Sequence, residues 1–401
     1  MTSVELFAGV GGLALGVSRA GFRHLAVIER DEDACDTIRE NQRRRLDLVA
    51  GWPLRQADVR SFSFDDLGEG TDLLAAGVPC QPWSLGGKHR GFEDERNLFP
   101  ETIKAVLALR PKAILIENVK GLTRQSFANY FTYIQFMLEF PEIRRRSNEG
   151  WLDHRSRLEK QVTQRGKSYT GLRYNVIPKL INAANYGVPQ RRERVFIVAF
   201  RSDLGVKWSF PKETHSEESL ILSKWITGEY WERHKIAKSK RPSQPVASRK
   251  EGYYSGTLFD GTHQPWVTVR DAISDLPVPM ESSSALHNHV FNPGARSYPG
   301  HTGSPIDEPA KTLKAGDHGV PGGENMLRSL SGQVRYFTVR ESARLQSFPD
   351  DFLFRGSWTE IMRQLGNAVP VRLAEVIASD IKRHLLAARS NAPGATKRIS
   401  S

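Results

Sequence analysis

Residues 5–16 read ELFAGVGGLALG, and this stretch decides the fold. The pattern Gly9-x-Gly11-x-x-Ala14 follows an apolar run and predicts a strand, a tight turn and a helix. Glu29 ends the next apolar run, 20 residues after Gly9. Glycines let the backbone approach a ligand closely, and a carboxylate at that spacing can accept both hydroxyl hydrogens of a ribose. We therefore predict a nucleoside site; the alternative is a tight turn that merely requires glycine.

Short apolar runs alternate with amphipathic stretches through the first 120 residues. This alternation is typical of the α/β class, with parallel strands joined by right-handed crossovers. Ligands of such sheets bind beyond the carboxyl ends of the strands, so functional residues should follow the apolar runs. We predict strands at 4–7, 25–28, 73–76, 113–116, 174–182 and 194–200, and helices at 31–44 and 97–109.

The later chain differs in composition. Residues 142–167 are polar, contain three consecutive arginines at 144–146 and have no clear period, so we expect a basic surface insertion. Residues 202–335 are rich in Gly, Pro, Ser and His, which predicts a second, smaller domain of loops and short strands. Helical periodicity returns at 338–346 and 371–386.

Charge is unevenly distributed along the 401 residues. The chain carries a formal net charge of +12, but residues 1–120 hold 16 basic and 18 acidic side chains, net −2. The other 281 residues hold 41 basic and 27 acidic side chains, net +14. This asymmetry indicates a polyanion-binding portion joined to a near-neutral portion, unless the basic surface is simply solvated.

Composition also excludes several classes of protein. Two cysteines, Cys35 and Cys80, cannot form a disulfide scaffold or by themselves enclose a structural zinc, and we expect no metal. No apolar run approaches the roughly 18 residues of a membrane helix, and the N-terminus lacks a signal-peptide layout, so we expect no membrane association. A reducing, cytoplasmic location is the default expectation.

Two strand ends present reactive side chains. In residues 73–84, LLAAGVPCQPWS, an apolar run leads into a turn on which two prolines bracket Cys80. A free cysteine is usually a small buried apolar residue, but the bracketing prolines favour an exposed nucleophile. The run at 113–116 ends in Glu117, whose pKa we expect to be raised by partial burial. Cys80 and Glu117 thus form a candidate nucleophile and acid pair.

Other polar residues flank the predicted strands. The segment QRRER at 190–194 leads into the last apolar run, and residues two apart in a strand share a face. Arg192 and Arg194 should therefore point together into the cleft, toward a phosphate or a carbonyl oxygen, unless the run is a solvated charge cluster. Asp58 follows a short run and can accept a hydrogen bond from an adenine amino group or cap a turn.

These motifs, in this order, resemble those of the DNA (cytosine-5)-methyltransferase family of bacterial restriction–modification systems. The resemblance covers nearly the whole chain, and its main departure is the longer basic segment between ENV and QRRER. It implies an S-adenosylmethionine-dependent methyltransferase (Rossmann-like) mixed sheet with a smaller, loop-rich target-recognition domain. The matching motifs are FAGVGG at 7–12, Glu29, Asp58, GVPCQPWS at 77–84, GFEDERNLF at 91–99, ENV at 117–119, QRRER at 190–194, RESARLQSFPDDF at 340–352 and QLGNAVP at 364–370.

The resemblance also implies a mechanism. Cys80 would attack C6 of a flipped-out cytosine while Glu117 serves N3 and the amino group, so that C5 accepts a methyl group from S-adenosylmethionine. Arg194 would hold the base O2, and Arg192 would support the active-site loop or a nearby phosphate. The residues implied to bind the cofactor are Phe7, Gly9, Gly11, Glu29, Asp58, Leu98 and Asn367, and those implied to bind DNA are Gln81, Ser84, Thr312 and Leu313.

The resemblance further predicts a discontinuous catalytic domain, residues 1–201 and 336–401, and a target-recognition domain, residues 202–335. The expected partner is double-stranded DNA. We expect a monomer with no obligate protein partner, associated with the nucleoid through DNA, and a cognate restriction endonuclease, if present, would act separately.

Other function classes remain open on the residues alone. An RNA methyltransferase of the same architecture, acting on cytosine in tRNA, would use the same cysteine chemistry. A dehydrogenase is compatible with the glycine loop and Glu29, because nicotinamide dinucleotides also contain adenosine, but it leaves Cys80 unexplained. A non-catalytic DNA-binding regulator fits the charge but gives Cys80 and Glu117 no purpose. The target sequence cannot be read from residues 202–335.

Overall fold

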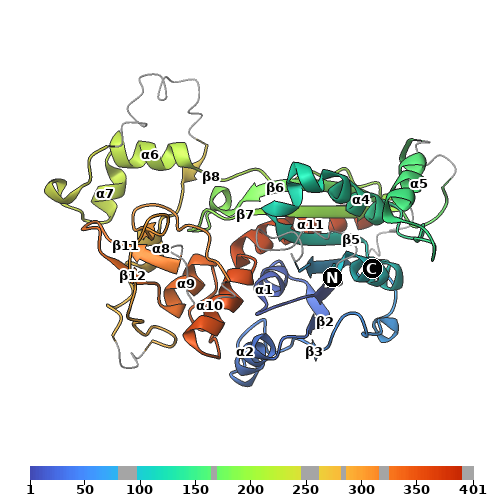
Figure 1. The fold of residues 1–401 in the computed structure, drawn as a ribbon, viewed down its shortest axis with the longest axis horizontal. Coiled ribbons are helices and arrows are strands. Elements are labelled where there is room, and N and C mark those ends of the chain that lie inside the picture. Colours follow the sequence, from blue (N-terminus) through green and yellow to red (C-terminus); the bar gives the residue numbers. More distant parts are fainter. Residues whose placement is uncertain (80–96, 164–168, 245–261, 281–285, 316–324, 391–401) are drawn as a thin grey trace, which may run out of the picture. The chain divides into compact units, whose positions relative to one another are not determined.

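The computed structural model describes residues 1–79, 97–163, 169–244, 262–280, 286–315 and 325–390 (Figure 1). The chain divides into two compact units. Unit 1 comprises residues 1–181, 193–211 and 374–401, and unit 2 comprises residues 182–192 and 212–373. This division follows packing rather than function, so the assignment of residues 1–201 and 336–401 to catalysis and 202–335 to target recognition stays a prediction. The two divisions differ at residues 182–192 and 336–373, which belong to unit 2, and at residues 202–211, which belong to unit 1.

Unit 1 is built on a seven-stranded sheet in the order β3-β2-β1-β4-β5-β7-β6. The pairs β1·β2, β1·β4, β2·β3 and β4·β5 are parallel, whereas β5·β7 is antiparallel, so the sheet is mixed as predicted. Strand order reverses between β1 and β4, the type of switch point where α/β sheets bind ligands. The strands are β1 (Thr2–Leu6), β2 (Arg23–Glu29), β3 (Leu54–Gln56), β4 (Leu73–Gly77), β5 (Ala113–Val119), β6 (Tyr174–Asn182) and β7 (Glu193–Arg201).

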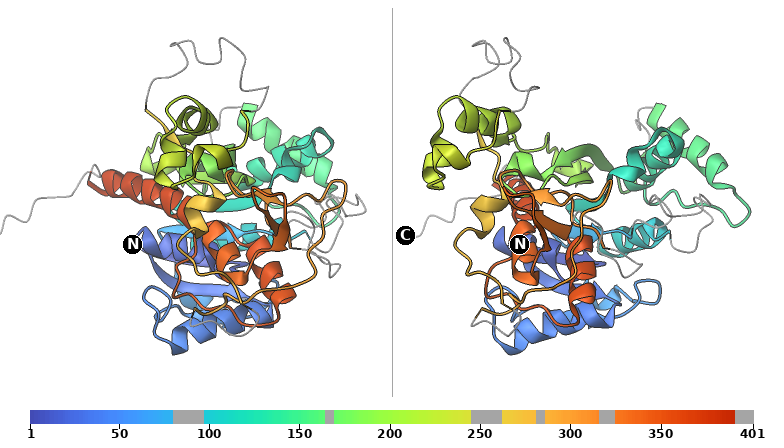
Figure 2. Two further views of the ribbon diagram at one scale, coloured as in Figure 1. Left: turned by 90° about the vertical axis from the view of Figure 1, so that its left-hand side faces the viewer. Right: turned by 60° about the vertical axis from the view of Figure 1, so that its left-hand side comes forward.

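The central strands of this sheet are buried, and helices lie on both of its faces (Figure 2). Alternate strand residues such as Val4, Leu74 and Ile116 pack in one cluster with α3 and α4. On the opposite face Phe200 of β7 contacts the ring of His384 on α11. The helices are α1 (Gly12–Arg19), α2 (Glu32–Arg43), α3 (Phe99–Leu109), α4 (Ala128–Glu139), α5 (Trp151–Thr163) and α11 (Val371–Ser390).

Helix α11 returns the end of the chain to unit 1. Its apolar positions Leu373, Ile377, Ile381 and Leu385, four residues apart, are all buried, as the sequence pattern predicts. Polar contacts join the helix to distant segments of unit 1: Trp208 donates to Asp380 at 2.7 Å, Lys382 to the carbonyl of Gly21 at 3.2 Å and Arg389 to Asp72 at 2.6 Å.

The elements that the structure describes in unit 2 are short, at most ten residues. Capping boxes begin two of its helices, with Thr268 and Asp271 at α8 and Thr338 and Glu341 at α9. The short strands agree with the prediction for residues 202–335, whereas the helices α6, α7 and α8 were not predicted. Its helices are α6 (Glu217–Trp225), α7 (Glu229–Arg233), α8 (Val269–Ile273), α9 (Val339–Leu345) and α10 (Trp358–Asn367), and its strands are β8 (His215–Ser216), β9 (Gln264–Pro265), β10 (Ser304–Pro305), β11 (Met326–Arg328) and β12 (Val334–Tyr336).

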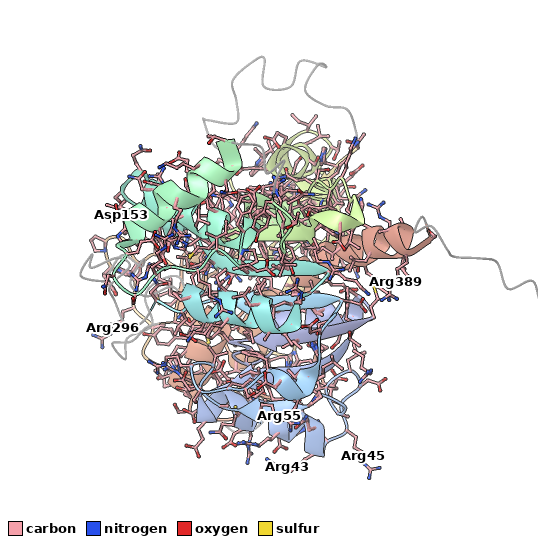
Figure 3. The ribbon with its side chains drawn as sticks, turned by 90° about the vertical axis from the view of Figure 1, so that its right-hand side faces the viewer. Arg43, Arg45, Arg55, Asp153, Arg296 and Arg389 are labelled. Carbon is pink, nitrogen blue, oxygen red and sulfur yellow. The ribbon has the colours of Figure 1, made fainter. Side chains whose placement is uncertain are left out.

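One expectation about local structure is wrong. The segment 142–167, expected to be a basic surface insertion without a clear period, contains the helix α5. Its residues His154 and Leu158 are buried, and Trp151 and Val162 pack against the core cluster. Strand β3 was missed because its three residues, LRQ, show no apolar alternation. Figure 3 shows Arg43, Arg45 and Arg55 projecting from the edge of unit 1 near α2 and β3. Within the described part of the chain, no helix is long and apolar enough to span a membrane.

Candidate active site

The loop after β1 adopts left-handed backbone conformations at three positions. Phe7, Gly9 and Gly11 have φ of 56°, 53° and 87°. A Cβ on Gly11 would lie 2.7 Å from the Trp52 ring, so only glycine fits there. A Cβ on Gly9 would meet nothing within 4 Å. The loop is therefore packed against Trp52 at Gly11, whereas the space beside Gly9 is open. That open space can admit a ligand close to the backbone.

Glu29 lies beside this open position, at the end of β2. One carboxylate oxygen accepts a hydrogen bond from the Gly9 amide at 2.7 Å, and the other accepts from the Arg30 and Asp31 amides at 2.8 Å each. A carboxylate has about four acceptor sites. Three are thus occupied, so binding both hydroxyls of a ribose would require one backbone donor to move. The carboxylate and the open glycine nevertheless fit a nucleoside.

Two other predicted cofactor residues also lie in unit 1. The Asp58 carboxylate accepts hydrogen bonds from Arg60, with an Nη2–Oδ2 distance of 2.6 Å. These hydrogen bonds, with charge from Arg30, hold the pKa of Asp58 well below its usual range. Leu98 precedes α3 and is 7% exposed. The roles of both residues at a cofactor stay predictions.

The carboxyl ends of β4 and β5 lie side by side. Gly77 pairs with Glu117 in parallel register, and the Asn118 side chain donates to the Val78 carbonyl at 3.1 Å. This hydrogen bond joins the chain just beyond β4 to the end of β5. The next residue after Pro79 is Cys80, which lies outside the described residues, as do Gln81 and Ser84. The described residues that lead to Cys80 therefore lie beside Glu117.

Glu117 and Arg194 form an ion pair at this edge. The distance from Arg194 Nε to Glu117 Oε1 is 3.0 Å, and their side chains are 13% and 9% exposed. The antiparallel pairing of β5 with β7 sets this contact, because Val119 is the register partner of Arg194. Glu117 is buried as predicted, but the sequence analysis did not anticipate a cation against its carboxylate. Its raised pKa therefore stays a prediction.

Arg192 has different surroundings, in unit 2. It is 1% exposed, and its guanidinium donates to three backbone carbonyls, those of Leu313 at 3.1 Å, Gly366 at 2.7 Å and Ala368 at 2.9 Å. The expectation that Arg192 shares a strand face with Arg194 is wrong, because β7 begins at Glu193. Backbone carbonyls thus accept from both terminal nitrogens of this arginine.

The Thr312–Leu313 pair belongs to the same network. The Leu313 amide donates to Gln190 Oε1 at 3.0 Å, and the Thr312 hydroxyl donates to the Arg191 carbonyl at 2.7 Å. Leu313 is 1% exposed, so its side chain serves packing, whereas Thr312 is half-buried. Asn367 is exposed and ends α10. The DNA and cofactor contacts predicted for these residues stay predictions.

Sequence reasoning assigned no role to three residues that shape these sites. Gln190 and Asn118 stand within the quoted motifs QRRER and ENV, so the motifs themselves were the available signal. Trp52 had no such signal. Its ring packs against Gly11, and its indole N–H donates to Ser18 of α1 at 3.0 Å.

Comparison with known proteins shows the family of the chain. The family model of C-5 cytosine-specific DNA methylases matches residues 1–140 and 149–383. The chain is 32% identical to the type II methyltransferase M.PspPI of Psychrobacter sp., over 96% of this chain and 80% of that one. It is also 32% identical to M.NgoMIV of Neisseria gonorrhoeae, over 96% of this chain and 98% of that one.

Solved structures share the fold. A prophage-encoded protein of Escherichia coli matches with a TM-score of 0.57 and 20% identity, over 96% of this chain and 99% of that one. The Dnmt2 methyltransferase of S. pombe matches with a TM-score of 0.52 and 18% identity, over 98% and 99%. The chain belongs to the family of C-5 cytosine-specific DNA methylases and transfers methyl groups from S-adenosylmethionine to C5 of cytosine in DNA.

Proposed function

We propose that the chain methylates one cytosine within a specific duplex sequence through a transient bond between Cys80 and C6 of an extruded base. The observation behind this proposal is the edge formed by β4, β5 and β7. There Gly77, three residues before Cys80, pairs with Glu117, and Glu117 meets Arg194 at 3.0 Å. A nucleophile, an acid and a guanidinium would then surround one planar base.

The chemistry requires this combination because C5 of cytosine is a weak nucleophile. The Cys80 thiolate forms a bond to C6, and the electron pair of the C5–C6 double bond becomes available at C5. S-adenosylmethionine, when bound, supplies an electrophilic methyl group to C5. The C5 proton then leaves to solvent, the C6–S bond breaks and Cys80 is released as a thiolate, which restores the aromatic ring.

Glu117 and Arg194 act on the polar edge of the base. Protonated Glu117 donates to N3 and its carbonyl oxygen accepts from the amino group, which draws electrons from the ring during attack at C6. The Arg194 guanidinium holds O2 while it keeps the neighbouring carboxyl group in place. The donor would be held by the open loop at Gly9 and by Glu29, with Phe7, Gly11, Asp58, Leu98 and Asn367 as the further predicted contacts.

A base inside a duplex cannot meet a nucleophile above its ring. The target must be extruded at an unstacking cost of a few kcal/mol, which phosphate and groove contacts offset. Residues 121–401, with a net charge of +14, supply the cations for these contacts. We assign target recognition to residues 202–335, with Gln81, Ser84, Thr312 and Leu313 as the predicted DNA-contacting residues.

The relatives' names suggest a biological setting. M.PspPI and M.NgoMIV are type II methyltransferases. By likeness, the chain would protect DNA of its host from a cognate restriction endonuclease that acts separately. We propose that it works as a monomer in the cytoplasm, associated with nucleoid DNA.

Methylation mapping tests the proposal. Bisulfite sequencing of DNA from bacteria that express the protein should show cytosines protected at one recurrent sequence, and Cys80→Ser should abolish the protection. A duplex with 5-fluorocytosine at the target should form a denaturation-resistant adduct, because fluorine blocks the loss of the C5 substituent. Scattered protection, protection by Cys80→Ser or absence of the adduct would each contradict a part of the proposal.

The RNA alternative is separated by substrate. Labelled methyl groups from S-adenosylmethionine should enter target duplex DNA and not tRNA. Preferential labelling of tRNA would replace the DNA proposal while retaining the cysteine chemistry.

A further inference from the structure

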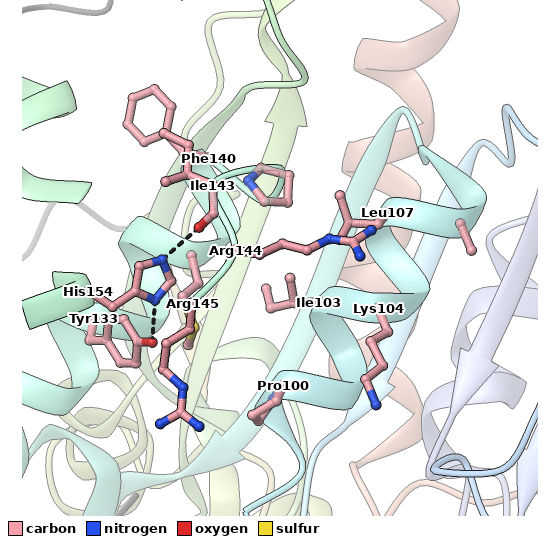
Figure 4. Close-up of a pocket in the computed structure, with 13 residues that line it drawn as sticks. Pro100, Ile103, Lys104, Leu107, Tyr133, Phe140, Ile143, Arg144, Arg145 and His154 are labelled. Atoms are coloured by element: carbon pink, nitrogen blue, oxygen red, sulfur yellow. Dashed lines mark hydrogen bonds between the residues drawn. The ribbon is translucent and has the colours of Figure 1, made fainter. Parts of the chain in front are cut away.

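Unit 1 contains a cavity of about 510 Å³ that lies between α3, α4 and the segment leading to α5 (Figure 4). A volume of this size is typical of ligand pockets. Glu117 and Arg194 are not among the residues that line it. The lining residues are Pro100, Ile103, Lys104, Leu107, Ala108, Tyr133, Met137, Phe140, Pro141, Ile143, Arg144, Arg145 and His154.

The interior of the cavity is apolar. Phe140 is fully buried and Met137 is 7% exposed, and both contribute to the main core cluster. Ile103 and Ile143 pack against the same cluster from the cavity walls. An apolar group that enters here would leave water and contact side chains that the core already fixes, which is the usual source of affinity in a pocket.

A buried histidine fixes one wall of the cavity. His154 is 3% exposed, its Nε2 donates to the Ile143 carbonyl at 2.6 Å, and its Nδ1 accepts from the Tyr133 hydroxyl at 2.7 Å. Burial lowers the pKa of His154, so the ring is neutral near pH 7. The wall is therefore held by hydrogen bonds, and the charge of the site comes from other residues.

The rim of the cavity is positive. Lys104, Arg144 and Arg145 line it, and none of the described lining residues is Asp or Glu. Figure 4 shows the Arg144 side chain extending toward Leu107. Two nearby acids have arginine partners outside the lining: Glu142 accepts from Arg110 at 3.0 Å, and Glu149 accepts from Arg157 at 2.8 Å and 2.7 Å. Lys104 donates a hydrogen bond to Glu101 at 3.0 Å, so the carboxylate balances the charge of this lysine. The net charge of the rim stays positive.

Part of the cavity lies outside the family match. The family model passes over residues 141–148, which supply Pro141, Ile143, Arg144 and Arg145. The same stretch includes the basic run that the sequence analysis identified as the main departure from the family. Methyl transfer is common to the family, so it does not explain why these residues form a wall of the cavity.

We propose that the cavity binds an acidic peptide segment of a partner protein. A large apolar side chain of the segment fills the cavity, and flanking carboxylates pair with Arg144 and Arg145. Charge complementarity favours an acidic ligand, and the apolar interior favours a peptide over duplex DNA. DNA phosphates would use the arginines but leave the apolar walls uncovered, because duplex bases stay stacked.

Fluorescence anisotropy with the full-length protein tests this proposal. The probe is the fluorescein-labelled peptide DEDFEDE, compared with DEDSEDE, which lacks the apolar anchor, and KRKFKRK, which reverses the charge. We expect saturable binding of the first peptide and at least about tenfold weaker binding of the other two. Absence of saturable binding, or equal binding of DEDSEDE, would overturn the proposal.

Variants locate the binding to the cavity. Arg144→Glu/Arg145→Glu and the cavity-filling Ala108→Trp should each weaken DEDFEDE binding at least about tenfold. Arg146→Glu is the matched control, because Arg146 is exposed in the same run but does not line the cavity. Methylation of target DNA should stay unchanged in Ala108→Trp, and urea denaturation of the charge-reversal variants should show that they fold like the wild type.

Two results would contradict this location. One is an equal loss of binding in Arg146→Glu. The other is competition for the peptide by a short duplex without a target site, together with a loss of duplex affinity in Arg144→Glu/Arg145→Glu. The second result would assign the surface to nucleic acid instead of a protein.

Discussion

Arg192 and Arg194 stand two residues apart in one motif, yet one belongs to the packed interior of unit 2 and the other to the edge of the sheet where β5 ends. Arg192 donates to three backbone carbonyls of unit 2. Arg194 faces Glu117 at the end of β5 in unit 1. The difference separates an arginine that joins segments of unit 2 from one that pairs with the acid of the proposed site, although both belong to one motif.

Replacing the edge arginine should have the largest effect. Arg194→Gln removes the guanidinium from the base and from Glu117, so we expect kcat to fall by about 10² to 10³. Single-turnover methylation of target DNA measures this effect. The melting temperature should fall far less than in an Arg192 variant. An unchanged kcat would place Arg194 with Arg192 as a folding residue and remove the contrast.

Replacing the interior arginine should act on stability. Arg192→Met leaves three carbonyls without a donor, so the free energy of unfolding should fall by about 3 kcal/mol. Urea denaturation measures this loss. Arg191→Met is the matched control. Arg191 is 43% exposed and pairs with Glu217 and Glu308, so its loss should cost about 1 kcal/mol or less. Equal losses in the two variants would show that the buried hydrogen bonds contribute little.

His24 extends the comparison to a second buried polar residue. Its ring nitrogens contact Ser3 Oγ and the Ala14 carbonyl at 3.0 Å each, and desolvation by burial lowers its pKa from 6.5 to about 4. The unfolded chain therefore binds a proton below pH 6.5 that the folded chain excludes until about pH 4. The different proton affinities of the two states stabilise the folded chain at pH 7, and this stabilisation is lost as the pH falls from 6.5 to about 4.

Between pH 7 and pH 5 the loss at His24 should be about 2 kcal/mol. Urea denaturation of the wild type and of His24→Asn at both pH values isolates this contribution, because other groups titrate in both proteins. Identical pH slopes for the two proteins would show that His24 ionises in the folded state as it does in the unfolded chain.

Two glycines of the loop after β1 give the smallest contrast. Gly11→Ala meets Trp52 at 2.7 Å and should cost about 2 kcal/mol of stability, whereas Gly9→Ala meets open space and should cost about 1 kcal/mol for its positive φ. Thermal unfolding measures both. Gly9→Ala should weaken S-adenosylmethionine binding in calorimetry, because its methyl group enters the open space. Unchanged binding would show that the cofactor does not lie against Gly9.

Much of the fold follows from local patterns. The predicted strand at 174–182 coincides with β6, and the predicted helix at 31–44 agrees with α2 within one residue at each end. The Asp31 side chain, which accepts from the Ala34 amide at 2.9 Å, caps that helix. Such signals are short-range, and they survive in the tertiary structure because each one agrees with the packing around it.

Long-range contacts decided what local patterns could not. Helix α5 is mostly polar, and the core that buries His154 and Leu158 is formed largely by other segments of unit 1. The pairing of Glu117 with Arg194 needs the antiparallel register of β5 with β7, and these residues are far apart in the chain. The cavity lined by Arg144 and Arg145 likewise requires α3, α4 and α5 together.

The amino-acid sequence by itself determined the α/β class, the glycine loop, the order of the motifs and, through them, the family and its cofactor. The tertiary structure decided which of two neighbouring arginines faces the acid, how Glu29 divides its acceptor sites, and where the basic insertion forms a cavity. The physical reason is that motifs depend on residues close in sequence, whereas hydrogen-bond partners and burial depend on segments that only folding brings together.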